Sequence, residues 1–418
     1  MGSAGPDWLI VRASRLIDGA GAPPIERPTV VIHRGMIHEI RGGGAAPTSD
    51  RPRGVPELDL AGHTLLPGLI DAHVHLVLPG DGTPFETSVR EPDGVLLATA
   101  IHNAQTALRA GITTLRDCGS MRDTTLEIRR AQQLGYAVVP RLHLCRCPMT
   151  ITGGHCWYFG GEADGPEGVR AMVRRLAKAG VDFIKMMASG GGTLGTYSSR
   201  PSYTVEELRA AVDEAHRLHR RVGIHCTCAD ATRNAVAAGA DHIEHALFLS
   251  DEQGRQRFEP EVADAVAQRR IPVTSTLCVG HFLVDTLSVR DGATPEERAA
   301  VERWRRTNDD NMRNAGRMRQ AGVGYVAGTD AGWRFTPFDG LVRELELLHE
   351  AGMSAGDAIA AATSAAAGAM GIADEVGTLR AGLRADMIAV AGDPLEDLAA
   401  LRRPAMVMLG GTPVVRPA

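Results

Sequence analysis

Short apolar runs alternate with helical segments along the middle of the chain, from residue 68 to about residue 370. Each run is followed by a segment in which apolar residues recur at the spacing of an amphipathic helix. The runs are GLIDAHVHL, GITTLRDCG, AVVPRLHLC, VDFIKMMAS, RVGIHCTC, ADHIEHALF, IPVTSTL and VGYVAGTDAG. Eight strand–helix units of this kind predict an α/β protein with a closed (β/α)8 TIM-like barrel.

The two ends of the chain show a different pattern. Apolar and polar positions alternate there over short stretches with Gly and Pro between them, which indicates strands and turns. We predict that residues 1–66 and 371–418 together form a small β-sandwich domain, and that residues 67–370 form the barrel. The length of 418 residues favours this division, because a single hydrophobic core rarely grows beyond about 300 residues.

Composition restricts the partners and the compartment. Hydrophobic residues make up 44% of the chain, charged residues 23%, and the net charge is -5, which is ordinary for a globular protein. We therefore expect a small-molecule substrate, and neither nucleic acid nor a membrane as partner. No run approaches the length of about 18 apolar residues that predicts a membrane-spanning helix. Seven scattered cysteines, an odd number, predict reduced thiols and a cytoplasmic location.

The candidate chemistry begins with Lys185, inside the apolar run VDFIKMMAS. Lysine and arginine together number 45, yet only Lys178 and Lys185 are lysines. A desolvated lysine can lose its proton and react with carbon dioxide, whereas arginine stays protonated. The resulting carbamate is an anionic ligand able to bridge two metal ions. The alternative is a lysine whose ammonium reaches solvent from a strand end, and Lys185 taken alone does not decide between the two.

Further candidate ligands fall at the ends of the predicted strands. In a (β/α)8 barrel the active site lies at the C-terminal ends of the strands, so side chains placed there converge. Each could be explained singly, as a core histidine or as an aspartate in a turn. Together they predict a metal site built from His73, His75, Lys185, His225, His245 and Asp330.

These residues also carry a resemblance to a known family. The segments PGLIDAHVHL, FIKMMASGGG, IHC, IEHA and GTDAG, with GTLRAGLRADMIAVAGDP near the C-terminus, resemble the signatures of the amidohydrolase superfamily. The similarity is to its binuclear metal branch, which includes Xaa-Pro dipeptidases (prolidases) and imidazolonepropionase-like hydrolases. It covers essentially the whole chain and is far more specific for the metal site than for the substrate. Relatives of this kind are commonly homo-oligomers.

The resemblance implies a role for each candidate ligand. His73 and His75 would hold the first metal ion, His225 and His245 the second, and Asp330 would be a ligand of the first. Lys185, carboxylated on its side-chain nitrogen, would bridge two divalent ions, for which zinc fits the ligand set. A metal-bridging hydroxide would attack an amide-type carbonyl, with Asp330 as general base and then general acid.

The substrate class stays open. The substrate we favour is a dipeptide or an N-acyl amino acid. The alternative is a cyclic amide, such as an imidazolone or a lactam, or a carbamate. A non-enzymatic binding protein is disfavoured, because none of the six candidate ligands is missing. Thr227 is a candidate substrate contact, because it stands where related dipeptidases often carry a tyrosine that binds the substrate carboxylate. A short hydroxyl cannot reach as far, so recognition of a dipeptide's free C-terminus is less favoured.

Several residues are candidate substrate contacts. His155, in the GGH segment after the third strand, resembles a histidine that hydrogen-bonds the substrate carbonyl, and solvent exposure is its alternative. His143 is either a core histidine or a substrate contact. The Gly/Ser-rich loop after Lys185 predicts a lid over the site, with Tyr197 and Arg200 as carboxylate contacts.

Overall fold

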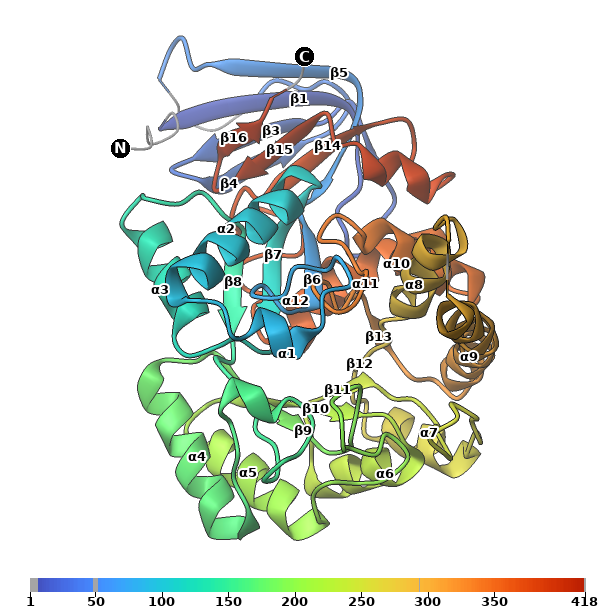
Figure 1. Ribbon diagram of the computed structural model, residues 1–418. Coiled ribbons are helices and arrows are strands. Elements are labelled where there is room, and N and C mark those ends of the chain that lie inside the picture. Colours follow the sequence, from blue (N-terminus) through green and yellow to red (C-terminus); the bar gives the residue numbers. More distant parts are fainter. Residues whose placement is uncertain (1–6, 48–51, 293, 417–418) are drawn as a thin grey trace.

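The computed structural model describes residues 7–47, 52–292 and 294–416. Its described strands form three hydrogen-bonded sheets. One sheet, built from both ends of the chain, lies at one end of the molecule, and two parallel sheets with their helices form the rest (Figure 1). The chain therefore has a mixed α/β fold.

The terminal sheet joins the two ends of the chain. Its order is β16-β15-β14-β5-β1-β3-β4, with β2 paired to β1. Strand β14 runs antiparallel to β5, with Met387 opposite Pro67. The strands are β1 (Trp8–Leu16), β2 (Ile25–Glu26), β3 (Thr29–His33), β4 (Met36–Arg41), β5 (Glu57–Pro67), β14 (Met387–Ala391), β15 (Met406–Leu409) and β16 (Thr412–Val415). The two termini do share a sheet, but the predicted β-sandwich is not confirmed, because all eight described strands belong to one sheet.

Two parallel sheets form the centre of the molecule. The first has the order β6-β7-β8 and the second β13-β12-β11-β10-β9. Their strands are β6 (Leu69–Val74), β7 (Ile112–Asp117), β8 (Arg141–Leu144), β9 (Phe183–Met187), β10 (Arg221–Cys226), β11 (His242–His245), β12 (Val273–Thr274) and β13 (Tyr325–Val326). All eight expected strands are present, in the expected sequence order.

The edges of these two sheets approach each other through irregular backbone. On one side the Ala72 amide donates to the Ala327 carbonyl at 3.0 Å, and on the other the Asp182 amide donates to the Leu144 carbonyl at 2.8 Å. At the edge between β6 and β13, β13 is only two residues long, which leaves little regular strand to pair. The described residues thus form two sheets, and one closed eight-stranded barrel is not confirmed.

Helices follow most of the central strands, as the apolar spacing predicts. They are α1 (Phe85–Ser88), α2 (Asp93–Arg109), α3 (Thr124–Gln133), α4 (Gly165–Ala179), α5 (Val205–Arg217), α6 (Ala229–Ala238), α7 (Pro260–Gln268), α8 (Cys278–Ser288), α9 (Pro295–Gln320), α10 (Leu341–Glu350), α11 (Ala355–Ala361) and α12 (Ser364–Met370), with 3-10 turns η1 (Trp157–Phe159) and η2 (Leu398–Arg402). Helices α4 and α6 end at Gly180 and Gly239, whose φ angles of 86° and 87° lie in the left-handed region that glycine tolerates best.

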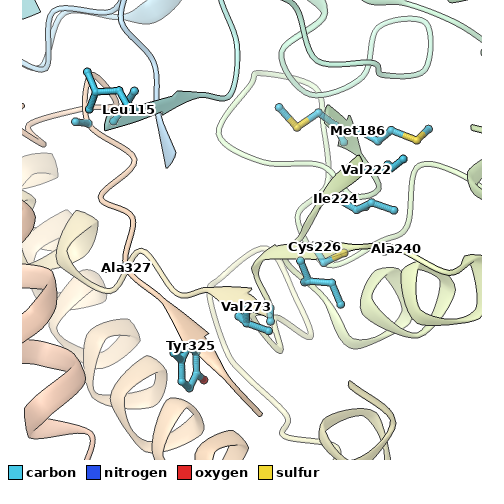
Figure 2. Packing of buried hydrophobic residues seen from close by; sticks show 14 of the residues in the cluster. Leu115, Met186, Val222, Ile224, Cys226, Ala240, Val273, Tyr325 and Ala327 are labelled. Atoms are coloured by element: carbon cyan, nitrogen blue, oxygen red, sulfur yellow. The ribbon is translucent and has the colours of Figure 1, made fainter. Parts of the chain in front are cut away.

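The main hydrophobic core lies between these strands and helices. All residues of β6, β7 and β9 are buried, which is typical of parallel strands covered on both faces. Figure 2 shows side chains of neighbouring strands, among them Met186, Ile224 and Val273, within this core. All seven cysteines are free and buried, as the composition predicts. Within the described residues, no helix is both long and apolar enough to cross a membrane.

Candidate metal centre

The six side chains predicted as metal ligands face one cavity of about 340 Å³. They reach it from the ends of five different strands, because the C-terminal ends of parallel strands meet at one edge. They are His73 at the end of β6, His75 just beyond it, Lys185 on β9, His225 on β10, His245 at the end of β11 and Asp330 shortly after β13. Groups far apart in the sequence are thereby brought into one pocket.

The potential ligand atoms lie close together around His73. Its Nε2 atom is 3.5 Å from Nζ of Lys185 and 3.6 Å from Oδ1 of Asp330. Asp330 Oδ1 is also 3.3 Å from Nε2 of His75. One ligand atom each from His73, His245 and Asp330 fits within 4.8 Å of the others. The ring of His225 lies 4.7 Å from that of His245, so the fourth histidine borders the same group.

The backbone is strained where two of these side chains leave it. His245 has a φ of 68° and Asp330 a φ of 60°, both in the left-handed region. Such a conformation costs of the order of 1–3 kcal/mol in a non-glycine residue, and it persists only where surrounding contacts hold it. One such contact is the hydrogen bond from the Asp330 amide to the His73 carbonyl, at 2.8 Å. In this conformation the side chains of both His245 and Asp330 lie close to His73.

A buried ion pair orients His73. Glu244, on β11, is fully buried. Its Oε2 atom lies 3.0 Å from Nδ1 of His73, and its Oε1 atom accepts a hydrogen bond from Arg116 at 2.7 Å. Burial acts to raise the pKa of Glu244, but Arg116, His242, Lys185 and His73 together outweigh it and hold that pKa well below its usual range. An ionised Glu244 only accepts, so Nδ1 of His73 carries the proton and Nε2 faces the cavity with its lone pair.

Two other histidines are fixed through the same ring nitrogen. Nδ1 of His75 donates to the Gly119 carbonyl at 3.2 Å, and Nδ1 of His245 contacts the Thr276 hydroxyl at 2.8 Å. In both rings Nε2 is the nitrogen left for the cavity. Hydrogen bonding of one imidazole nitrogen while the other stays available is typical of histidines that bind metal ions.

The electrostatics of the cavity favour neutral imidazoles. Burial lowers the pKa of His73 to about 4 and that of His245 to about 3, and it holds the pKa of His225 well below its usual value. Burial acts to raise the pKa of Asp330, but the neighbouring His73 and His75 outweigh it and lower that pKa below its usual range. A neutral imidazole and an ionised carboxylate are the forms that bind a metal ion.

The donor set fits divalent metal ions. Oδ1 of Asp330 is buried and has no hydrogen-bond partner among the described residues. Lys185 is fully buried, and within the same residues no carboxylate forms an ion pair with it. An isolated ammonium and an unsatisfied carboxylate oxygen are both costly in a dry site. A metal ion held by nitrogen and oxygen ligands would satisfy the carboxylate, and carboxylation would replace the positive charge of the lysine by a negative one that the metal ions would balance.

Two of the predicted substrate contacts lie at the same cavity. His155 is buried there, with Nδ1 2.8 Å from the Thr193 hydroxyl and its ring 4.9 Å from that of His225. Thr227 also lines the cavity, but its hydroxyl donates to the Ser198 carbonyl at 2.6 Å. Thr227 therefore holds the loop that follows β9, and its hydroxyl is already engaged.

The structure does not bring the other predicted contacts to the cavity. His143 stacks on Phe183, with ring centroids 5.3 Å apart, and borders a different hollow. Tyr197 is 55% exposed, and Arg200 lies over its ring at 5.1 Å. Neither belongs to the described residues that line the cavity. The loop instead turns Gly191, Gly192 and Ser198 inward, which a prediction based on residue type alone could not anticipate.

The chain is similar to known hydrolases over most of its length. Ochratoxinase from Aspergillus niger is 27% identical over 435 residues, which cover 95% of this chain and 84% of that protein. Imidazolonepropionase from Chloroflexus aggregans (strain MD-66 / DSM 9485) is 23% identical over 454 residues, which cover 98% of this chain and 96% of that protein. The crystal structure of a Xaa-Pro dipeptidase with methionine bound in the active site superposes with a TM-score of 0.84 at 27% identity, over 98% of this chain and 100% of that one.

Fold and site together define a metal-dependent hydrolase that acts on carbon–nitrogen bonds. The profile of the amidohydrolase family matches residues 64–414, so the chain belongs to that family. The resemblance seen in the strand-end motifs is thereby confirmed.

Proposed function

We propose that this protein is a binuclear metal-dependent hydrolase that cleaves an amide-type bond of an N-acyl amino acid or a dipeptide. The observation that carries the proposal is Lys185, which is fully buried beside His73 and without a carboxylate partner among the described residues. A permanent ammonium there would be costly, whereas a carbamate would be a bridging ligand.

Each ligand has a proposed place. His73, His75 and Asp330 would hold one ion, and His225 and His245 the other. Lys185, carboxylated on its side-chain nitrogen, would bridge them. Nitrogen and oxygen ligands of this kind suit zinc.

We propose different roles in the reaction for the metal ions, Asp330 and His155. Bound divalent ions lower the pKa of water from about 15.7 towards about 7 and polarise a substrate carbonyl. Asp330, which is ionised, would take a proton from the attacking water and return it to the leaving nitrogen. His155, buried in the same cavity, would donate a hydrogen bond to the carbonyl oxygen as negative charge develops.

The two parallel sheets together have the eight strands of a barrel. We infer that the two parallel sheets form one (β/α)8 barrel, because backbone hydrogen bonds connect them at both edges. The bridges between Val74 and Ala331 and between Met149 and Met186 are parallel, as a closed barrel requires.

Hydrolysis of a cyclic amide is the second candidate. The observation that favours it is the similarity to imidazolonepropionase over 98% of this chain. Such a substrate presents its scissile bond within a ring.

A hydrolysis screen separates the two functions. Zinc-loaded protein is tested against dipeptides, N-acyl amino acids, aryl amides, carbamates, lactams and imidazolones, with metal-stripped protein and Asp330→Asn as controls. We expect turnover of linear amides that both controls lack. Turnover confined to lactams or imidazolones would favour the second candidate, and turnover unaffected by metal removal would refute both.

A further inference from the structure

An arginine beyond the metal centre faces the same cavity. Arg334 follows Trp333 in the loop after Asp330, and its guanidinium carbon lies 5.7 Å from the ring centroids of both Trp304 and Trp333. Its backbone is held in the left-handed region, with a φ of 52°, and its carbonyl accepts a hydrogen bond from Gly82 at 2.7 Å. The side chain is therefore positioned by two indole rings and a fixed loop.

Arg334 has no salt bridge within the described residues. Among the same residues its buried Nε atom has no hydrogen-bond partner. Arg303, on α9, lines the cavity nearby and adds a second positive charge. Burial and this neighbour lower the pKa of Arg334, although Asp330 and Glu86 act in the opposite direction. An arginine still stays charged, so this part of the cavity favours an anion.

The other acidic residues of the cavity already have partners. Asp251 pairs with Arg255, and Glu252 accepts hydrogen bonds from the backbone amides of Ser198 and Ser199, at 3.2 and 3.1 Å. They are therefore engaged on the protein and do not neutralise Arg334. They also do not offer an unpaired carboxylate for a substrate's free amino group.

An aromatic wall connects the arginine to the metal centre. The ring of Trp333 meets that of His155 edge to face at 5.9 Å and stacks on Phe85 at 4.5 Å. Gly192, in the loop after β9, lies against this wall, because a Cβ atom on it would come within 2.5 Å of Trp333. An apolar group can pack along Trp333 between the reacting bond at His155 and the charge of Arg334.

We propose that Arg334 binds the carboxylate of the substrate, and that this substrate is an N-acylated amino acid with an apolar side chain. The inference rests on the proposed hydrolase function and deepens it. A guanidinium recognises a carboxylate through two parallel hydrogen bonds, and Trp304 and Trp333 hold its plane. An acylated amine carries no positive charge, which suits a cavity whose acidic residues are engaged elsewhere. Arg334 thus takes the role that the sequence assigned to Tyr197 and Arg200.

Two compounds that differ only in the carboxylate test this inference. They are N-acetyl-L-phenylalanine and N-acetyl-2-phenylethylamine, which both release acetate when hydrolysed. With zinc-loaded protein we expect Arg334→Met to raise KM for the first compound at least about tenfold, because a hydrogen-bonded charge pair is lost. KM for the second compound should stay within about twofold. Arg303→Met should weaken binding of the first compound less, and Arg305→Met, on the same helix but outside the cavity lining, is the control.

Calorimetric binding of both compounds gives a readout that does not depend on turnover. Thermal melting and zinc content first establish that each variant is folded and loaded with zinc. If Arg334→Met is unfolded or lacks zinc, the same comparison is made with Arg334→Lys and Arg303→Met. The inference is supported if wild-type protein binds N-acetyl-L-phenylalanine more tightly than N-acetyl-2-phenylethylamine and the arginine variants lose this preference. If binding follows this pattern but neither compound is hydrolysed, only the hydrolase function is in question. A preference that survives Arg334→Met, or that only Arg200→Met removes, would overturn it. Wild-type protein without a preference would overturn it as well.

Discussion

Replacing Glu244 by Gln tests how the candidate metal centre is organised. The change keeps the size of the side chain and its acceptor for Arg116, but it puts an amide group opposite Nδ1 of His73, where the carboxylate oxygen lies at 3.0 Å. Two donors cannot face each other, so His73 must move its proton to Nε2 or turn away. Either response removes the lone pair that faces Lys185 and Asp330.

The expected size of the effect follows from these contacts. Loss of a partner that orients a metal-bound histidine lowers metal affinity about 10- to 100-fold. The variant also leaves the charge of Arg116 buried without its counterion, which costs about 3–5 kcal/mol of the free energy of unfolding. Glu344→Gln is the matched control, because Glu344 is equally buried but contacts Ser275 and Cys278.

Competition with a chelating indicator measures zinc affinity, and thermal melting measures stability. We expect Glu244→Gln to lose zinc affinity by the stated factor while Glu344→Gln binds zinc as the wild type does. Zinc affinity within about threefold of wild type in a folded Glu244→Gln protein would show that Glu244 does not orient His73 for metal binding.

Three further predictions concern single residues. Lys185→Ala should lose bound metal and regain part of it when a short-chain carboxylate is added; metal content equal to the wild type by elemental analysis would contradict the bridging role. Asp330→Asn should keep most of its metal but lower kcat at least about 100-fold, and retained turnover would exclude Asp330 as the proton-transferring group. Thr204→Ala should lower the free energy of unfolding by about 1 kcal/mol through loss of the capping box of α5, whereas Thr204→Ser should keep it; equal denaturation midpoints would contradict this.

The sequence could predict that the six candidate side chains meet in one cavity, because strand geometry is regular. His73 and His75 are two positions apart, so they point to the same side, and the other candidates lie on or shortly after parallel strands. No side-chain packing had to be known. The strands and helices of the central segment were predictable for the same reason.

The remaining parts of the site depend on contacts that no periodicity records. Glu244 and Arg116 meet across separate strands, and Arg334 lies in the cavity beside Trp304, which comes from distant α9. The only sequence signal for Glu244 was a charged residue within a buried run. Tyr197 had the residue type of a substrate contact, but the loop turns it outward.

The central claim is that carboxylated Lys185 bridges two metal ions. It is tested most directly by carbon NMR of protein loaded with zinc and isotope-labelled bicarbonate, together with the metal content of the same sample. We predict a carbamate signal and two zinc ions per chain, with the signal absent and the zinc content reduced in Lys185→Ala. Active protein that holds two metal ions but shows no carbamate signal, or the same signal from Lys185→Ala, would contradict the claim.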